Sequence, residues 1–364
     1  MSRAEATQQF ADALRQSNTG AAADAAQTPS RLIPGDEFLR KTAVRVQPLW
    51  GNEDEVLWSE QESLILTGSP SSGKTTVAQH VTLGLIGLQD MVLGYPVARR
   101  DRVLYLAMDR PRQIARSFQR MVTEADYDIL HERLIVWEGP PPADIAKEPS
   151  LLLGLTQEAD AQVVIIDSLK DAALGLTDDK IGAAVNRAIQ MCLAAGVDVL
   201  VIHHQKKQSG SGNGGAPTDL TDVYGSVWIT AGAGSVVLLH GNPGSGTAVL
   251  RHLKPPAEPV GPLHVKFDYY TGAVTRADTF DPLAWLRSQH QPVTAQHLAA
   301  AAYGDQDRSA VERARRDLDR LTRRSLACRH DGHRGGSGGG TATTWTAAVN
   351  PGQDPLPDPP EDPL

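Results

Sequence analysis

Residues 68–75, which read GSPSSGKT, decide how the rest of this chain is interpreted. The stretch holds a glycine, four residues and then Gly-Lys-Thr, which is the spacing of a phosphate-binding loop. Glycines at both ends permit the tight turn that directs backbone N–H groups toward phosphate oxygens. An apolar strand is expected just before the loop, at residues 63–67, and a helix just after it, at 76–85. The sequence therefore predicts a nucleotide site, and the alternative is an ordinary glycine-rich turn.

The polar residues of this loop have expected roles. Lys74 is placed to contact the β- and γ-phosphates, and the hydroxyl of Thr75 is placed to bind Mg²⁺. The helix that starts here turns its positive N-terminal end toward the bound anion. The residues expected to hold the nucleotide are Gly68, Ser71, Ser72, Gly73, Lys74, Thr75 and Thr76.

Composition limits the classes of protein to consider. A chain of 364 residues is long enough for one large α/β domain and a smaller second domain. The formal net charge of −8 excludes a uniformly basic surface for nucleic acid, so such contacts must come from local basic patches. Two cysteines far apart in the sequence, Cys192 and Cys328, favour a reduced cytoplasmic protein. No apolar run long enough to span a bilayer and no signal peptide are found, so no membrane contact is expected.

Changes of composition along the chain predict four parts. Residues 1–30 are rich in Ala, Gln, Ser and Thr and are expected to form a disordered arm. Residues 31–278 should form the α/β domain that carries the phosphate loop. Residues 281–348 read as a separate small domain, and the proline-rich acidic stretch 351–364 reads as a disordered tail or a docking peptide.

Three aromatic or aliphatic residues stand just before the first core strand. Trp50, Leu57 and Trp58 are expected to pack over that strand or against the base of the nucleotide, and packing alone would explain them.

An apolar strand over residues 103–108 leads directly to Asp109. Ligands bind at the carboxyl ends of parallel strands, so Asp109 is a candidate to orient and deprotonate an attacking water. The alternative is that Asp109 caps the helix expected at 111–124, because an Asp shortly before a Pro also suits a cap.

Two later strands also end in polar residues. The β-branched strand at 161–166 closes with Asp167, the Walker B pattern, which places one carboxylate near Mg²⁺. The strand at 197–202 runs into the polar residues His203-His204-Gln205. All these strand ends are expected beside the phosphate loop, where a polar residue would be able to sense the γ-phosphate.

Polar loops are expected after both of these strands, at residues 169–180 and 206–221. The second loop is rich in Gly and Ser and basic at its start, and it is either functional or a plain flexible connection. Strands expected at 235–240, 248–253 and 263–269 have no helices between them, which predicts an antiparallel extension of the parallel sheet.

The order of these motifs resembles that of the RecA-like ring ATPases, in the branch of the plasmid RepA-type replicative helicases and their phage and mobile-element relatives. The resemblance covers residues 48–276 and rests on GSPSSGKTT, VLYLAMD, VVIIDSL and VLVIHHQKK, then the pair Gly225-Ser226 and a strand followed by Lys254. It implies a RecA-like P-loop core, with a mostly parallel sheet covered by helices on both faces. It also implies a homo-oligomeric ring, a hexamer, that uses ATP and Mg²⁺ and acts on DNA as a helicase or translocase in replication.

The resemblance assigns a role to each matching residue. Lys74 and Thr75 would bind phosphate and Mg²⁺, and Asp167 would be the Walker B carboxylate. Asp109 would replace the catalytic Glu, and Gln205 or His204 would sense the γ-phosphate. Lys254 would belong to the basic finger. The loops at 169–180 and 206–221 would face single-stranded DNA in the ring channel.

This sequence departs from the family pattern at the finger. The Lys-x-Arg finger is replaced by Arg251-His252-Leu253-Lys254, in which only Lys254 matches well. The alternative function is therefore an ATP-switched DNA-binding regulator or loader that does not unwind.

Residues 281–348 resemble a winged helix that would bind duplex DNA. Helices are expected at 282–290, after Thr294 and at 309–323, followed by a strand, a glycine-rich wing at 335–340 and a returning strand with Trp345. The third helix has an apolar face with Val311, Leu318 and Leu321. Its basic residues are Arg313, Arg315, Arg316, Arg320, Arg323 and Arg324. They are placed to contact phosphates, or else belong to a solvated helix in which acidic residues alternate with them.

Overall fold

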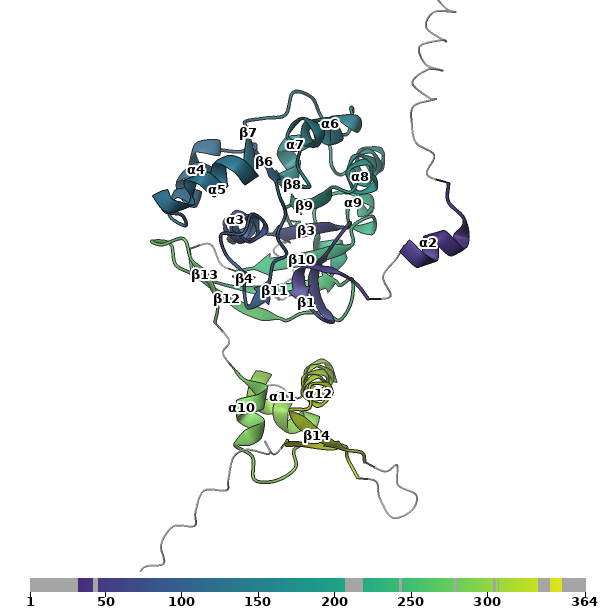
Figure 1. Ribbon diagram of the computed structural model, residues 1–364, viewed down its shortest axis with the longest axis vertical. Helices are drawn as coiled ribbons and strands as arrows, with labels where there is room; N and C mark the ends of the chain where they lie inside the picture. Colours follow the sequence, from purple (N-terminus) through teal and green to yellow (C-terminus); the bar gives the residue numbers. More distant parts are fainter. Residues whose placement is uncertain are drawn as a thin grey trace, which may run out of the picture. The chain divides into compact units, whose positions relative to one another are not determined.

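A nine-stranded sheet forms the centre of the fold in the part of the chain that the structure describes, in the order β13-β12-β11-β10-β3-β9-β8-β6-β7 (Figure 1). The strands from β10 to β7 pair in parallel: β10 (Ser235–His240), β3 (Ser63–Gly68), β9 (Asp198–Ile202), β8 (Val163–Asp167), β6 (Val103–Ala107) and β7 (Leu134–Glu138). The antiparallel strands are β11 (Thr247–Lys254), β12 (Leu263–Phe267) and β13 (Val274–Arg276). The predicted α/β class, a mostly parallel sheet with an antiparallel extension, is confirmed.

The computed structural model describes residues 32–41, 45–206, 219–241, 244–277, 280–303, 306, 308–332 and 341–348. The predictions for the arm at 1–30, most of the loop at 206–221, the wing at 335–340 and the tail at 351–364 lie outside these residues. Two compact units divide the chain: residues up to His240 with Arg251–Gly261, and Gly241–Leu250 with the residues from Pro262 onward.

The four central parallel strands are buried along their whole length because helices cover both faces of the sheet. Every residue of β3, β6, β8 and β9 is buried, which is typical of a parallel sheet covered on both sides. Figure 1 shows α3 (Lys74–Leu85), α4 (Pro111–Gln119) and α5 (Tyr127–Arg133) on one side of these strands. On the other side lie α6 (Ser150–Glu158), α7 (Leu169–Ala172), α8 (Asp179–Ala194) and α9 (Val227–Ala231). No helix of the described residues is long and apolar enough to cross a bilayer.

A hairpin of β1 (Pro48–Asn52) and β2 (Glu55–Ser59) precedes the core and was not predicted. Its side chains Trp50 and Trp58 are completely buried. Both indole N–H groups donate to backbone carbonyls, of Val92 at 3.1 Å and Glu62 at 2.9 Å. These residues are part of the core, so the alternative that they contact the nucleotide base is wrong.

Two predicted boundaries differ from the structure, each for a local reason. The helix expected to reach residue 124 ends at Gln119, and a new turn begins at Thr123, whose backbone N–H donates to the Asp126 carboxylate at 2.7 Å. The loop expected at 169–180 contains α7, because the burial of Leu169 and Ala172 stabilises one helical turn there. Strands β4 (Met91–Val92) and β5 (Tyr95–Pro96) form a further small hairpin.

The C-terminal residues have a hydrophobic core of their own. The elements are α10 (Pro282–Arg287), α11 (Ala295–Tyr303), α12 (Arg308–Arg323), β14 (Ala327–His330) and β15 (Thr344–Ala347). Asp281 caps α10 by accepting hydrogen bonds from two backbone N–H groups, at 2.8 and 3.1 Å. Leu318 and Trp345 are almost fully buried in this core, and Val311 and Leu321 pack against it, as the apolar face of α12 predicted.

Candidate nucleotide site

The phosphate loop joins the end of β3 to the start of α3, and two glycines make this connection possible. A Cβ atom on Gly68 would lie 2.2 Å from the backbone oxygen of Leu239 in the neighbouring strand β10. Gly73 has a φ of +94°, in the region that favours glycine. The loop therefore requires glycine at both positions, for the close approach of two strands and for the turn into the helix.

Hydroxyl groups of this loop are buried without a hydrogen-bond partner within the described residues. They are Ser69 Oγ and Ser72 Oγ, together with Thr67 Oγ1 from the end of β3. The residue that precedes α3, Gly73, has no side chain to cap the first N–H groups of the helix. Unpaired buried donors around a helix N-terminus are what a phosphate group would satisfy, so the loop fits a nucleotide.

Lys74 is nearly buried and lies against the carbonyls of its own loop. Its Nζ atom donates to Gly68 O at 3.1 Å and to Ser69 O at 2.7 Å. Burial lowers the pKa of Lys74 to about 8, the charge of Asp167 opposes this shift, and the charge of Lys170 adds to it. A bound phosphate would supply the strong counter-charge that neutral carbonyls do not.

Asp167 stands at the end of β8, within reach of the first helical turn of α3. Its Oδ1 accepts from Thr75 Oγ1 at 3.3 Å, and its Oδ2 accepts from the hydroxyl of Tyr105 at 2.7 Å. Burial raises the pKa of Asp167, and the hydrogen bonds from Tyr105 and Thr75 with the charge of Lys74 oppose that rise. One carboxylate and one hydroxyl beside a phosphate loop are the protein ligands that Mg²⁺ takes together with water and phosphates, so Thr75 and Asp167 fit this metal.

The sequence motifs did not indicate Tyr105 as a residue of the site. It lies in the middle of β6, is completely buried, and its ring packs edge-on against Phe118 of α4 at 5.5 Å between centroids. Burial and the nearby Asp167 carboxylate raise the pKa of Tyr105 well above its usual value. A single hydroxyl-bearing residue inside an otherwise aliphatic strand was the available signal, because a buried Tyr needs a partner for its O–H group.

Asp109 follows β6 by two residues and lies in an ion-pair cluster. Its Oδ2 is 3.6 Å from Lys170 Nζ and 3.6 Å from Arg110 Nε. The residue at the cap position of α4 is Arg110, and Pro111 begins the helix. The alternative that Asp109 caps this helix is therefore wrong, and its carboxylate faces Lys170.

Backbone hydrogen bonds join the polar residues after β9 to β3, the strand that ends at the phosphate loop. His203 N donates to Leu66 O at 2.9 Å, and Gln205 N donates to Gly68 O at 3.2 Å. His204 Nδ1 and Gln205 Oε1 are buried without a hydrogen-bond partner within the described residues. Burial, with the nearby charges of Lys74 and Lys170, lowers the pKa of His204 to about 4, so its imidazole is neutral at pH 7. Both candidates for sensing the γ-phosphate therefore lie beside the loop.

Lys254 has its contacts elsewhere. Its Nζ atom donates to Thr230 O at 3.2 Å and to Ala231 O at 2.9 Å, the last carbonyls of α9. Nearby, His252 contacts Ser235 Oγ through Nε2 at 2.8 Å, and its Nδ1 accepts from Val260 N at 3.3 Å. In this structure Lys254 stabilises a helix end and does not join the cluster of Lys74, Asp109 and Asp167.

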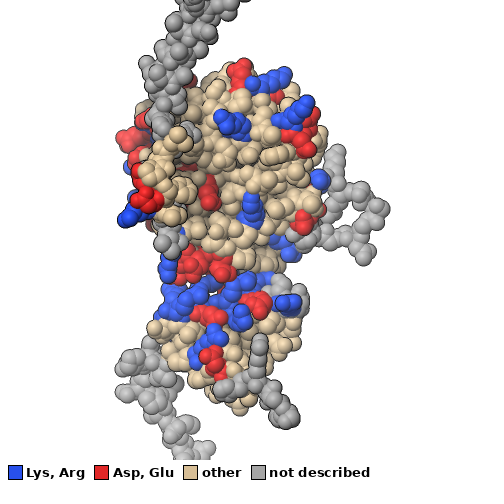
Figure 2. Space-filling view, turned by 90° about the vertical axis from the view of Figure 1, so that its right-hand side faces the viewer, with Lys and Arg blue, Asp and Glu red and all other residues tan. Residues whose placement is uncertain are grey.

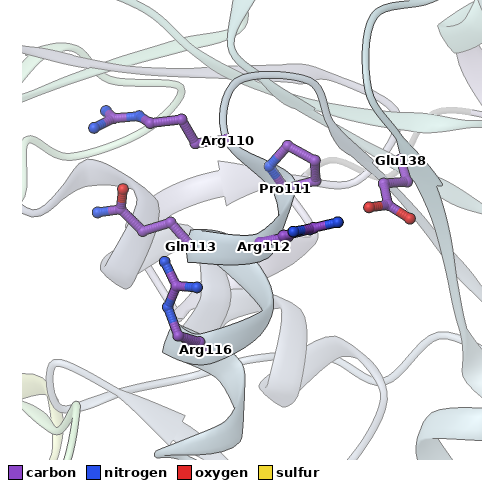
Figure 3. Close-up of a pocket in the computed structure, with 6 residues that line it drawn as sticks. All are labelled: Arg110, Pro111, Arg112, Gln113, Arg116 and Glu138. Atoms are coloured by element: carbon purple, nitrogen blue, oxygen red, sulfur yellow. The ribbon is translucent and has the colours of Figure 1, made fainter.

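An arginine-lined cavity of about 380 Å³ begins immediately after Asp109. Its lining residues are Arg110, Pro111, Arg112, Gln113, Arg116 and Glu138. Figure 3 shows Arg110, Gln113 and Arg116 on one side of the start of α4, and Arg112 directed toward Glu138 on the other. The helix is held against α3 by Gln79, which donates to Ile114 O at 3.0 Å and accepts from Ser117 Oγ at 2.6 Å. The sequence did not indicate this cavity, because the arginines read as ordinary surface residues of a helix.

A buried histidine beside the nucleotide site, His203, is expected to make the folded protein less stable in acid. His203 is completely buried, its Nε2 lies 2.6 Å from Tyr224 O, and burial lowers its pKa to about 4. The unfolded chain gains a proton near pH 6.5 and the folded protein does not, so stability falls as the pH drops from about 6.5 toward 4. At pH 5 we expect a loss of about 2 kcal/mol from this one group.

Urea unfolding at pH 7 and pH 5 checks this prediction. The difference in unfolding free energy between the two pH values should shrink in His203→Gln, while the exposed control His131→Gln should leave it unchanged. Comparison of variants is needed because burial raises the pKa of Asp167 and Asp198, and those carboxyl groups change stability with the opposite sign. An equal pH difference in the wild type and His203→Gln would contradict the prediction.

Comparison with known proteins gives one family match. The AAA domain family matches residues 27–210, half of the chain, and the matched stretch contains the phosphate loop, Asp109, Asp167 and Gln205. A search of curated proteins found no match. The matched half contains the same strand ends that the structure brings together around a loop built for phosphate. The chain therefore belongs to the AAA domain family and is an ATPase of the P-loop class.

Proposed function

We propose that this chain is a Mg²⁺-dependent, cytoplasmic ATPase of RecA-like fold that assembles as a hexameric ring. It acts on DNA as a helicase or translocase in the replication of a plasmid, phage or other mobile element, as the resemblance to RepA-type helicases implies. One observation carries the ATPase part of this proposal. The carboxyl ends of β3, β6, β8 and β9 bring Lys74, Asp109, Asp167 and His204 to one edge of the sheet.

Hydrolysis follows from the positions of these side chains. Backbone N–H groups of the loop and the Lys74 ammonium hold the phosphates, while Thr75 and Asp167 orient the metal. Mg²⁺, when bound, neutralises charge that develops on the phosphate oxygens. Asp109 accepts a proton from the attacking water while the water oxygen forms a bond to the γ-phosphorus. The bond between that phosphorus and the bridging oxygen of ADP breaks, and ADP leaves with the electron pair. Gln205 or His204 detects whether the γ-phosphate is present.

The proposed contact with duplex DNA lies in residues 281–348. Three helices followed by a two-stranded sheet have the element order of a winged helix, with α12 as the recognition helix. Figure 2 shows basic and acidic side chains next to one another on this unit. Arg315 is 3.3 Å from Glu312, and Arg320 is 3.3 Å from Asp317. Part of the positive charge of α12 is therefore compensated by acidic side chains of the same helix, so only a fraction of its arginines would be available for phosphate contacts.

A second function, an ATP-controlled DNA-binding switch without unwinding, is favoured by the surroundings of Lys254. A finger residue must reach the nucleotide of a neighbouring subunit, and it contributes about 10³–10⁵ in rate. Here the Lys254 ammonium holds the carbonyls of α9, and His252 occupies the middle of the finger sequence with both ring nitrogens engaged. A motor would have to release Lys254 from α9, whereas a switch would not.

The ATP hydrolysis rate of the intact chain, measured with and without single-stranded DNA, tests these functions. Strong stimulation by single strands supports a motor, because it requires loops near the site to couple strand binding to chemistry. Hydrolysis that single strands leave unchanged, together with binding to duplex only, supports the switch. No hydrolysis and no nucleotide binding under either condition would contradict both.

A further inference from the structure

Lys170 is a charged residue that the structure places beside Asp109 in the nucleotide site. The resemblance directs the loop at 169–180 toward DNA, but no motif gives Lys170 a contact with the nucleotide. It lies three residues after Asp167, in the single turn of α7. That turn is rigidly attached: Leu169 and Ala172 are buried, Ala172 O accepts from Ile145 N at 3.1 Å, and Ser168 Oγ donates to Asp171 at 2.8 Å. The backbone of Lys170 is thus held in place while its side chain, 44% exposed, remains free to change rotamer.

The ammonium of Lys170 is paired with the candidate base and is near enough to the phosphate-binding lysine to affect it electrostatically. Its Nζ is 3.6 Å from Asp109 Oδ2 and 3.9 Å from Asp171 Oδ1. It is also close enough to Lys74 and His204 for its charge to lower the pKa of both. Two ammonium groups beside a helix N-terminus are suited to bind a multiply charged anion.

The ion pair with Asp109 is suited to exchange. Both side chains are partly exposed, at 44% and 40%, and a solvent-exposed ion pair of this kind contributes little to stability. A γ-phosphate carries more negative charge than one carboxylate and offers three acceptor oxygens, so it competes well for an ammonium. Lys170 can therefore transfer its ammonium from Asp109 to a phosphate at little cost.

We infer that Lys170 makes the base available only when a γ-phosphate is present. Without nucleotide, Lys170 pairs with Asp109 and holds the carboxylate away from catalysis. When a nucleoside triphosphate binds, the Lys170 ammonium contacts the γ-phosphate, and Asp109 is released to orient the attacking water. Lys170 thereby supplies a positive charge to the γ-phosphate from the same chain. Lys254, the residue expected in the basic finger, donates instead to carbonyls of α9. This inference rests on the proposed ATP hydrolysis.

The test compares the affinity for ADP with the affinity for ADP–beryllium fluoride, which mimics a bound γ-phosphate, by calorimetry in the presence of Mg²⁺. The wild type should prefer the analogue, and Lys170→Met should lose about tenfold or more of that preference while its affinity for ADP changes little. The same variant should lower kcat by about 10²-fold. Lys170→Arg, which keeps the charge, should restore most of the preference, and the exposed control Lys147→Met should match the wild type.

Two results would overturn the inference: an unchanged preference for the analogue in Lys170→Met, or an equal loss of affinity for ADP and for the analogue. The second result would mean that Lys170 only supports the fold or the general charge of the site. Thermal unfolding of each variant separates loss of fold from loss of function. If the wild type binds neither ligand, the proposed ATPase function fails; if it binds both and Lys170→Met binds them as the wild type does, only the role of Lys170 fails.

Discussion

Replacing Lys74 by alanine is expected to abolish ATP hydrolysis, with a loss of at least about 10³-fold in kcat/KM. The Lys74 ammonium is buried, and the carbonyls of Gly68 and Ser69 hold it against the phosphate loop, so its loss removes the cation that the loop itself supplies to the phosphates. Any ATP-dependent DNA unwinding should be lost together with hydrolysis. Release of phosphate in a steady-state assay and strand separation of a forked duplex measure the two activities.

Duplex binding should survive this substitution. Residues 281–348 have their own hydrophobic core around Leu318 and Trp345, which does not depend on the phosphate loop. Lys147→Ala, at an exposed position shortly before α6, is the matched control and should hydrolyse ATP at the wild-type rate. Unwinding that persists in Lys74→Ala would contradict the proposed motor, and hydrolysis that persists would contradict the proposed site.

Replacing Asp109 by asparagine should separate binding from chemistry. The amide cannot accept the proton of the attacking water, so we expect kcat to fall about 10²–10⁴-fold. The affinity for ATP should be kept or increased, because the substitution removes a negative charge close to the γ-phosphate and frees Lys170 from its ion pair. Single-turnover hydrolysis gives the rate, and calorimetry with a slowly hydrolysed ATP analogue gives the affinity.

The control for this prediction is Asp128→Asn, an exposed position in the first turn of α5, which should change neither quantity. A kcat within a few-fold of the wild type in Asp109→Asn would show that another group takes the proton. A fall in affinity as large as the fall in kcat would instead show that Asp109 maintains the shape of the site.

The motifs of the site could be predicted because each is a local property of the chain. A phosphate loop needs glycine where a Cβ meets Leu239 O and where φ is positive, and both positions carry glycine. The strand that closes with Asp167 and the strand before His203 are continuous apolar runs, so their ends could be placed within one or two residues. The rule that parallel strands meet at their carboxyl ends then predicted one site from segments far apart in the sequence.

Contacts between side chains of different segments could not be predicted in this way. Tyr105 and Asp167 are 62 residues apart, and nothing in either strand shows that they share a hydrogen bond. The same holds for Lys254, whose sequence context resembles a finger but whose ammonium binds the end of α9. Pairings of this kind depend on strand register and on rotamers that the surrounding core selects.

The sequence by itself determined the α/β class, the phosphate loop, and the strand ends that carry Asp109 and Asp167, because backbone geometry and hydrophobic pattern act over a few neighbouring residues. Only the tertiary structure decided that Trp50 and Trp58 belong to the core, that Asp109 pairs with Lys170 instead of capping α4, and that an arginine-lined cavity opens beside them. These outcomes required strands and helices from distant parts of the chain to pack together, because burial and charge at each position depend on neighbours that packing supplies.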